Sequence, residues 1–167
     1  MTKEITGVRH FIRQVAFQTL FQLNSNETIE QNDAIQFALL KDEATQNKDL
    51  TIEEMIQTGL PQKYRNEDII HDSAIFLSEL LEGIRDHQAQ IDQVIDENMS
   101  AWNVERIHLT HLTILRIAAY ELLFMPETDP RIVMNEAIEL SKEFSDEKSR
   151  KFINGVLQGI QNSKKEA

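Results

Sequence analysis

The stretch HLTHLTILRIAAYELLFM, residues 108–125, decides the fold class. It contains neither Pro nor Gly, and its Leu, Ala, Arg and Glu residues favour a helix. Apolar residues recur at steps of three and four, and they cover most of the circumference of the predicted helix. Such a helix is typical of the centre of a bundle, with neighbours on several sides. Thr113, Arg116 and Tyr120 form one narrow polar face, which we expect to be a solvated edge or part of a binding surface.

Composition limits the class of protein. A chain of 167 residues can bury a core. The absence of cysteine excludes disulfides, thiolate zinc sites and a Cys nucleophile. With 5 Gly and 3 Pro, the sequence favours helices over turns. This composition agrees with the all-α fold that we expect. We recognise neither a signal peptide nor a membrane-spanning segment, and therefore expect a cytoplasmic protein that is not bound to a membrane.

The net charge of −11 is unevenly distributed. The two ends of the sequence are basic, whereas the middle is acidic. Arg9 and Arg13 lie near the start, and Lys148, Arg150 and Lys151 lie near the end. If the ends meet in space, they form a positive patch on an acidic protein. The alternative is that both ends are solvated segments, and charge alone does not separate the two interpretations.

Further helices are predicted before the central one. Residues 6–23 carry a helical apolar face, with Arg9 and Arg13 on the opposite side. Thr28–Gln31 fits a capping box that starts a helix running to about Asp42. Residues 43–65 resemble a long polar connection that includes a short helix at 52–58, which the capping box Thr51–Glu54 begins. Two more helices follow, one after the cap residue Asn66 and one carrying Ile91, Val94, Ile95 and Met99.

Around and after the central helix, residues that are typical of helix ends predict the remaining helix boundaries. Trp102 is a candidate core anchor and Asn103 a candidate cap. Asp129-Pro130 predicts a helix start, with Asp at the N-cap and Pro in the first turn. Ser145 or Asp146 starts the last helix. Gly155 and Gly159 lie one turn apart in that helix, which predicts that another helix backbone approaches there.

Motifs for catalysis are missing. We find no phosphate-binding loop, dinucleotide fingerprint, nucleophile elbow or zinc-protease motif. His108 and His111 are three residues apart, but no third ligand is suitably spaced, so a surface pair is the better interpretation than a metal site. Acidic pairs lie in polar stretches and are expected to be solvated. We therefore expect a protein that is not an enzyme and that needs no metal or cofactor.

Several segments together resemble one family. ILRIAAYEL (114–122), MNEAIELSKEF (134–144) and KFINGVL (151–157) are similar to the C-terminal signature of the NusB family of bacterial transcription antitermination factors. RQVAFQTLFQL (13–23) resembles the first helix of that family. The resemblance covers most of the chain except about residues 25–65. It implies an all-α bundle of about seven helices in two packed three-helix subdomains, which we place at about 1–89 and 90–167 of a single domain.

The resemblance also implies a function. Family members are expected to bind the single-stranded boxA element of leader RNA together with NusE, a small-subunit ribosomal protein, so that RNA polymerase keeps elongating through ribosomal RNA operons. An alternative is the RNA-binding module of ribosomal RNA cytosine methyltransferases. That module would be followed by a catalytic domain, whereas this sequence ends at Ala167, so we rank it second. The sequence leaves a homodimer open.

Binding of single-stranded RNA needs cations for phosphates and flat groups for bases. For Arg116 the alternative is an internal salt bridge, with Glu121 or with a carboxylate in 129–144. For Phe152 the alternative is a place in the core. The candidate RNA-binding residues are Arg9, His10, Arg13, Arg116, Tyr120, Lys148, Arg150, Lys151 and Phe152.

The resemblance further implies a protein-binding face on the first helix and the region after Trp102. Its candidate residues are Phe21, Glu105, Arg106 and His111. Two of the family positions depart from the expected pattern. His111 stands where acidic residues are usual, and Lys148 stands where an acidic residue can occur, a change that should favour RNA.

Overall fold

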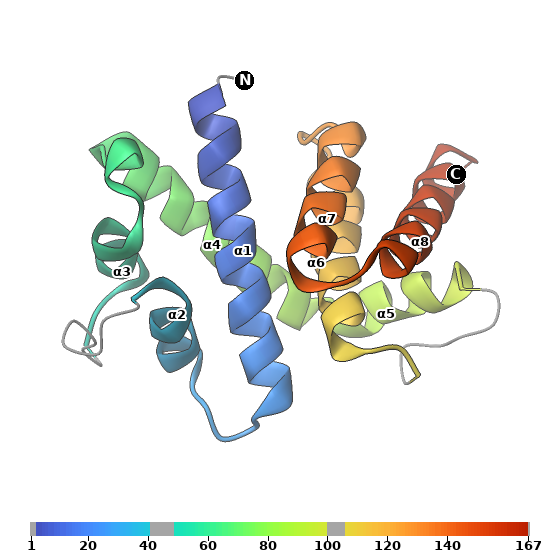
Figure 1. Cartoon of the computed structure of the whole chain (residues 1–167), viewed down its shortest axis with the longest axis horizontal. Helices are drawn as coiled ribbons and strands as arrows, with labels where there is room; N and C mark the ends of the chain where they lie inside the picture. Colours follow the sequence, from blue (N-terminus) through green and yellow to red (C-terminus); the bar gives the residue numbers. More distant parts are fainter. Residues whose placement is uncertain (1–2, 41–48, 100–105, 167) are drawn as a thin grey trace. The chain divides into compact units, whose positions relative to one another are not determined.

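The computed structural model describes residues 3–40, 49–99 and 106–166 (Figure 1). Within these ranges the regular elements are eight α-helices and one short 3-10 helix, which confirms the all-α prediction. None of the described helices combines the length and the apolarity that a membrane span requires. Contacts divide the chain into unit 1, Met1–Leu81, and unit 2, Glu82–Ala167. The predicted subdomains 1–89 and 90–167 stay a prediction.

Unit 1 is built around the first helix. The helix α1 packs against α2, and α2 packs against α3 (Figure 1). The buried face of α1 carries the apolar residues that the sequence analysis predicted for it, among them Val8, Ile12 and Val15. The elements are α1 (Lys3–Ser25), α2 (Gln31–Leu39), α3 (Ile52–Gly59), the 3-10 helix η2 (Gln62–Tyr64) and α4 (Glu67–Asp86), which continues into unit 2.

Two of the predicted helix caps in unit 1 form and one does not. Thr51 accepts a hydrogen bond from the Glu54 amide at 3.1 Å, and Asn66 accepts one from Ile69 at 2.9 Å. The capping box predicted at Thr28–Gln31 is wrong. The Thr28 hydroxyl donates to Asn26 Oδ1 at 2.7 Å instead, and α2 begins without a side-chain cap. That helix also ends at Leu39, short of the predicted Asp42.

The segment predicted as a polar connection contributes to the core. Met55, Ile56 and Leu60 are completely buried, so α3 packs as a full member of unit 1. Arg65 closes the end of α3, because its guanidinium donates to the Leu60 carbonyl at 2.7 Å and to the Thr58 carbonyl at 2.9 Å. The short helix predicted at 52–58 is confirmed as α3, whereas the interpretation of 43–65 as a polar connection missed the part that this helix takes in the core.

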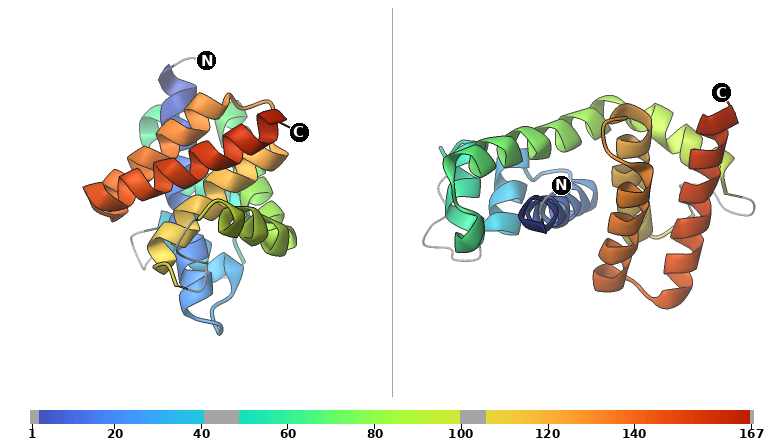
Figure 2. Two further views of the ribbon diagram at one scale, coloured as in Figure 1. Left: turned by 90° about the vertical axis from the view of Figure 1, so that its right-hand side faces the viewer. Right: turned by 90° about the horizontal axis from the view of Figure 1, so that it is seen from above.

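Unit 2 surrounds the central helix. The helix α6 contacts α5, α7 and α8, and α7 also packs on α8 (Figure 2). Its residues Ile114 and Leu115 are completely buried, which confirms the central position predicted for the stretch 108–125. The four helices are α5 (Gln88–Glu97), α6 (Leu109–Phe124), α7 (Pro130–Phe144) and α8 (Glu147–Glu166).

Side chains set the boundaries of the helices in unit 2. Asp129 caps α7, with Pro130 in the first turn, and Asp146 accepts a hydrogen bond from the Ser149 amide at 2.8 Å at the start of α8. Near the other end of α8, the ammonium of Lys164 donates to the Leu122 carbonyl in the last turn of α6. These contacts confirm the predicted starts of the last two helices. Trp102 and Asn103 lie outside the described residues.

Candidate nucleic-acid interface

A hollow of about 560 Å³ lies at the start of α8 in unit 2. Its walls come from residues before α6, the first turn of α6, the end of α7 and the first turns of α8. Four predicted site residues meet there, although the sequence assigned them to two different partners. Lys148 and Phe152 were predicted to bind RNA, and Arg106 and His111 were predicted to bind a protein.

The lining of the hollow combines apolar surface with cations. The half-buried side chains of Ile107, Phe144 and Phe152 supply apolar surface. Lys148 and Arg106 are exposed and supply positive charge, while the exposed carboxylate of Asp146 supplies one negative charge. An aromatic face beside cations is the combination that a nucleotide needs, because its base stacks while its phosphate is neutralised. The partial exposure of Phe152 is consistent with both interpretations that the sequence left open for it.

Two titratable side chains at this hollow have shifted pKa values. The pKa of the Asp146 carboxyl is lowered, chiefly by its hydrogen bonds with Ser149, and the pKa of His111 is lowered as well. Burial lowers the pKa of His111 from the ordinary value of 6.5, the nearby His108 lowers it further, and Asp146 opposes the shift. The two imidazole rings meet edge to face, with centroids 5.6 Å apart. His111 is thus favoured in its neutral form near pH 7, and an incoming phosphate would favour its protonated form.

The exposed face of α8 continues the positive character of the hollow. From Lys148 to Lys165 the sequence contains no acidic residue, which is unusual in a chain with a net charge of −11. Lys148 and Lys151 are exposed, and Arg150 is half-buried. We call the exposed residues Lys148, Lys151 and Gly155 the α8 face.

The two glycines of α8 differ in their surroundings. A Cβ atom at Gly159 would lie 2.5 Å from Asn98 Oδ1, so a side chain of α5, not a helix backbone, approaches that position. At Gly155 a Cβ atom would meet no described atom within 4 Å. The predicted close approach of another helix is therefore wrong at Gly155. A glycine in a helix interior costs about 1 kcal/mol relative to alanine.

The cations of α1 lie in unit 1 and are engaged with Phe76 of α4. The guanidinium carbon of Arg9 lies 3.8 Å from the centre of the Phe76 ring, and that of Arg13 lies 5.2 Å from it. His10 is half-buried, and Arg13 is only 3 % exposed. The expectation that Arg13 lies on the face of α1 opposite the core is therefore wrong. A joint surface of α1 and α8 cations stays a prediction.

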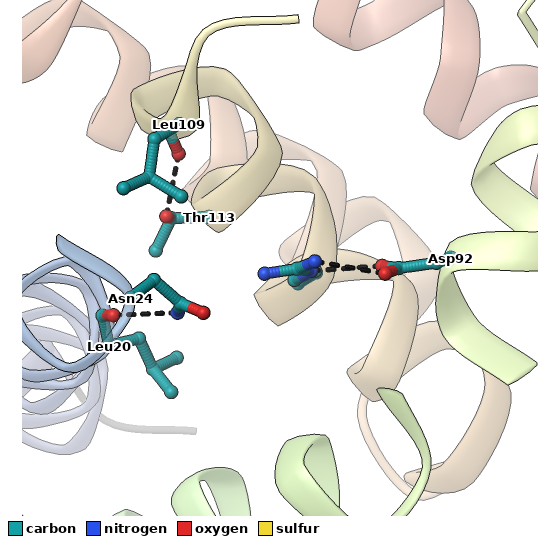
Figure 3. A network of polar contacts seen from close by, with 6 residues as sticks. Leu20, Asn24, Asp92, Leu109 and Thr113 are labelled. Carbon is teal, nitrogen blue, oxygen red and sulfur yellow. Dashed lines mark hydrogen bonds and ion pairs between the residues drawn. The ribbon is translucent and has the colours of Figure 1, made fainter. Parts of the chain in front are cut away.

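The polar face of α6 is buried, which corrects the interpretation of it as a solvated edge. Arg116 is 7 % exposed and Tyr120 6 % exposed. The Arg116 guanidinium donates two hydrogen bonds of 2.9 Å to the carboxylate of Asp92 on α5, marked by dashed lines in Figure 3. Thr113 bonds back to the Leu109 carbonyl at 2.6 Å. The alternative of an internal salt bridge thus holds for Arg116, although with Asp92 instead of Glu121.

One residue predicted to bind the protein partner lies in unit 1, and another lies outside the described residues. Phe21 is half-buried on α1, and its ring lies 6.1 Å from that of Phe17. Glu105 lies outside the described residues. Sequence reasoning missed Asp146 and Phe76 as neighbours of the predicted site residues. Asp146 had a usable signal, since it was a candidate cap beside Lys148, whereas nothing in the sequence pairs Phe76 with Arg9.

A metal centre has no support among the described side chains, because they form no group of three His, Cys, Asp or Glu residues suited to hold an ion.

Comparisons with known proteins agree with the family resemblance. The model of the NusB family matches residues 10–162. The transcription antitermination protein NusB of Ligilactobacillus salivarius is 39 % identical over 153 residues, covering 91 % of this chain and 96 % of the relative. That of Lactiplantibacillus plantarum is 39 % identical over 150 residues, covering 89 % and 91 %.

Solved structures show the same fold. A crystal structure of the antitermination factors NusB and NusE in complex with double-stranded RNA matches with a TM-score of 0.67 at 22 % identity, covering 93 % of this chain and 97 % of the solved one. A NusB structure from T. maritima matches with a TM-score of 0.66 at 24 % identity, covering 92 % and 90 %. The match of the family model and the identity to curated relatives over nearly the whole chain place this protein in the NusB family.

Proposed function

We propose that this protein is a transcription antitermination factor that binds boxA-type leader RNA together with NusE. The bound assembly keeps RNA polymerase elongating through ribosomal RNA operons, and it acts in the cytoplasm. The observation that carries the proposal is the hollow at the start of α8, where aromatic surface and cations meet in a member of the NusB family.

The RNA would occupy the α8 side of the hollow. Lys148 and Lys151 are exposed and can neutralise phosphates, and Phe152 offers a ring for stacking a base. Arg150 adds charge nearby. We further propose that Arg9, His10 and Arg13 contribute RNA contacts from α1. Because Arg116 and Tyr120 are buried, their proposed role is to hold α6 in the core of unit 2.

We propose that the protein partner contacts Arg106 and His111, which line the hollow before and at the start of α6. Phe21 on α1 and Glu105 stay further proposed contacts of that partner. Two sets of contacts that meet in one hollow explain why RNA and protein would bind together. A favourable contact between the two bound ligands would supply a coupling free energy, so that each would strengthen the binding of the other. The acidic charge of the chain also favours encounter with a basic ribosomal protein.

The proposal is tested by titrating boxA RNA, single-stranded and double-stranded in separate arms, with and without NusE. We expect binding of single-stranded RNA that NusE strengthens and that weakens linearly with the logarithm of salt concentration. Undetectable or salt-independent binding with NusE present would contradict the proposal. Stronger binding of the duplex would retain an RNA-binding function and reject the single-stranded target.

A matched pair of variants tests the site. Lys148→Gln removes a cation from the hollow, whereas Lys142→Gln removes one that is paired with Glu139 on α7 at 3.0 Å. We expect Lys148→Gln to reduce the salt slope of RNA binding by about 0.7, as one lost phosphate contact does for a single strand. Lys142→Gln should leave the slope unchanged. Equal slopes for both variants would remove the hollow from the RNA site.

A further inference from the structure

Gly155 is the one glycine in this chain for which no neighbour within the described residues accounts for the absence of a side chain. A Cβ atom at Gly7, Gly59 or Gly83 would collide with a tyrosine hydroxyl or a backbone carbonyl, and one at Gly159 would press on Asn98. At Gly155 the space is open, and the residue is exposed in the middle of α8. Almost any other residue at this position except proline would have a higher helix propensity than glycine.

The charges beside Gly155 indicate what occupies that space. Lys151 and Lys148 precede it by four and seven residues, a spacing that puts all three on one face of a helix. Both lysines are exposed, and the sequence holds no carboxylate from Lys148 to Lys165. This face is therefore suited to a polyanion, and it begins at the hollow, which Lys148 and Phe152 line.

We propose that the sugar–phosphate backbone of bound RNA leaves the hollow along the α8 face and lies directly against α8 at Gly155. The inference rests on the proposed RNA-binding function and extends it to a position that carries no charge. The missing side chain lets the strand approach the helix surface between the cation of Lys151 and the next turn. A side chain at this position would hold the strand away and lengthen its distance from both lysines.

The test uses Gly155→Ala and Gly155→Leu in the full chain, with single-stranded boxA RNA as the probe and NusE present. Gly155→Ala should raise the midpoint of thermal unfolding, because the helix gains propensity and the methyl group meets open space. The same change should weaken RNA binding by about threefold, and Gly155→Leu should weaken it by about tenfold or more. The salt slope should also become shallower, because a strand held away from both lysines has fewer neutralised phosphates although every cation remains.

The control is Gln90→Leu, an exposed position on α5, which should leave RNA binding unchanged. A lower unfolding midpoint for Gly155→Ala would overturn the inference, because it would reveal an internal role for the glycine. Unchanged RNA affinity in both Gly155 variants would overturn it as well, including the case in which only NusE binding is lost. Absence of RNA binding by the unmodified protein would instead reject the proposed function and the inference together.

Discussion

Arg116 and Lys148 show how burial separates two cations that look alike in the sequence. Arg116 lies inside unit 2, where both of its hydrogen bonds to Asp92 exclude a role at the surface in this arrangement. Lys148 is exposed at the hollow. Charge type alone therefore does not define the site, and the environment of each residue decides which one can reach a phosphate.

Arg116→Ala should behave as a structural substitution. It would leave the mostly buried carboxylate of Asp92 without its partner, and we expect the free energy of unfolding to fall by about 3 kcal/mol or more. The control Arg85→Ala removes a cation from the exposed pair with Asp86 and should cost less than about 1 kcal/mol. Urea unfolding of the two variants would measure both changes. Full stability of Arg116→Ala together with weak RNA binding would return Arg116 to the RNA surface.

His111 should make RNA binding depend on pH. Its pKa in the folded protein is lowered, so stability contributed by the neutral ring is present above the ordinary value of 6.5 and is lost as pH falls below it. RNA phosphates in the hollow would raise the pKa again, so binding takes up protons. RNA affinity should therefore rise as pH falls from about 8 to about 6. His111→Gln should flatten this rise, and an equally steep rise in the variant would assign the proton uptake to another group.

The sequence analysis predicted four of the residues that line the hollow as site residues. They are Lys148, Phe152, Arg106 and His111. The sequence also raised an internal salt bridge as the alternative for Arg116. The identity of the partner was out of reach, because Asp92 is on a different helix and only the packing of α5 on α6 brings the two together. Residue patterns report the local face of a helix, and partners across elements depend on packing.

The starts of α2 and α3 show that a local sequence pattern does not reveal which contacts compete with it. Thr28–Gln31 and Thr51–Glu54 fit the same capping pattern, yet only Thr51 caps its helix. The Thr28 hydroxyl is bound to Asn26 in the preceding turn, which competes with the cap. The periodicity that predicted α1, α4, α6 and α7 extends over many residues and is less sensitive to such competition. The short helix α3 was predicted, but its contribution to the core was not.

Two matched substitutions test this difference. Thr51→Ala removes the acceptor for the Glu54 amide and should lower the free energy of unfolding by about 1 kcal/mol. Thr28→Ala removes only a bond within an exposed turn, so its effect should be no more than about 0.5 kcal/mol. Urea unfolding of both variants gives the comparison. Equal losses would indicate that Thr28 also stabilises α2.

For the whole molecule, the excess of acidic residues and the local basic face act in opposite directions. A net charge of −11 destabilises the folded chain through repulsion, while the α8 face and the hollow attract an anion. The cations of α1 belong to unit 1 and those of α8 to unit 2. Their joint surface stays a prediction, since periodicity and charge order along the chain describe each unit and not the placement of one beside the other.

Added salt should therefore change stability and binding with opposite signs. Screening weakens the repulsion among carboxylates, so the free energy of unfolding should increase as salt rises to about 0.2 M. Over the same range RNA affinity should fall. Three neutralised phosphates on a single strand correspond to about a twentyfold loss between about 50 and 200 mM salt. Urea unfolding and RNA titration in the same buffers provide both measurements, and a parallel decrease of the two would contradict the charge separation.

The contact between Lys164 and the Leu122 carbonyl has a practical consequence for fluorescence work. It anchors the last turns of α8 to the end of α6, while the hollow lies at the first turns. A helix of 20 residues is about 30 Å long. A fluorescent dye attached at the C-terminal end of α8 would lie a full helix length from the hollow. Because that end of α8 is held to α6, the dye would report the rotational motion of the assembly without obstructing the RNA strand.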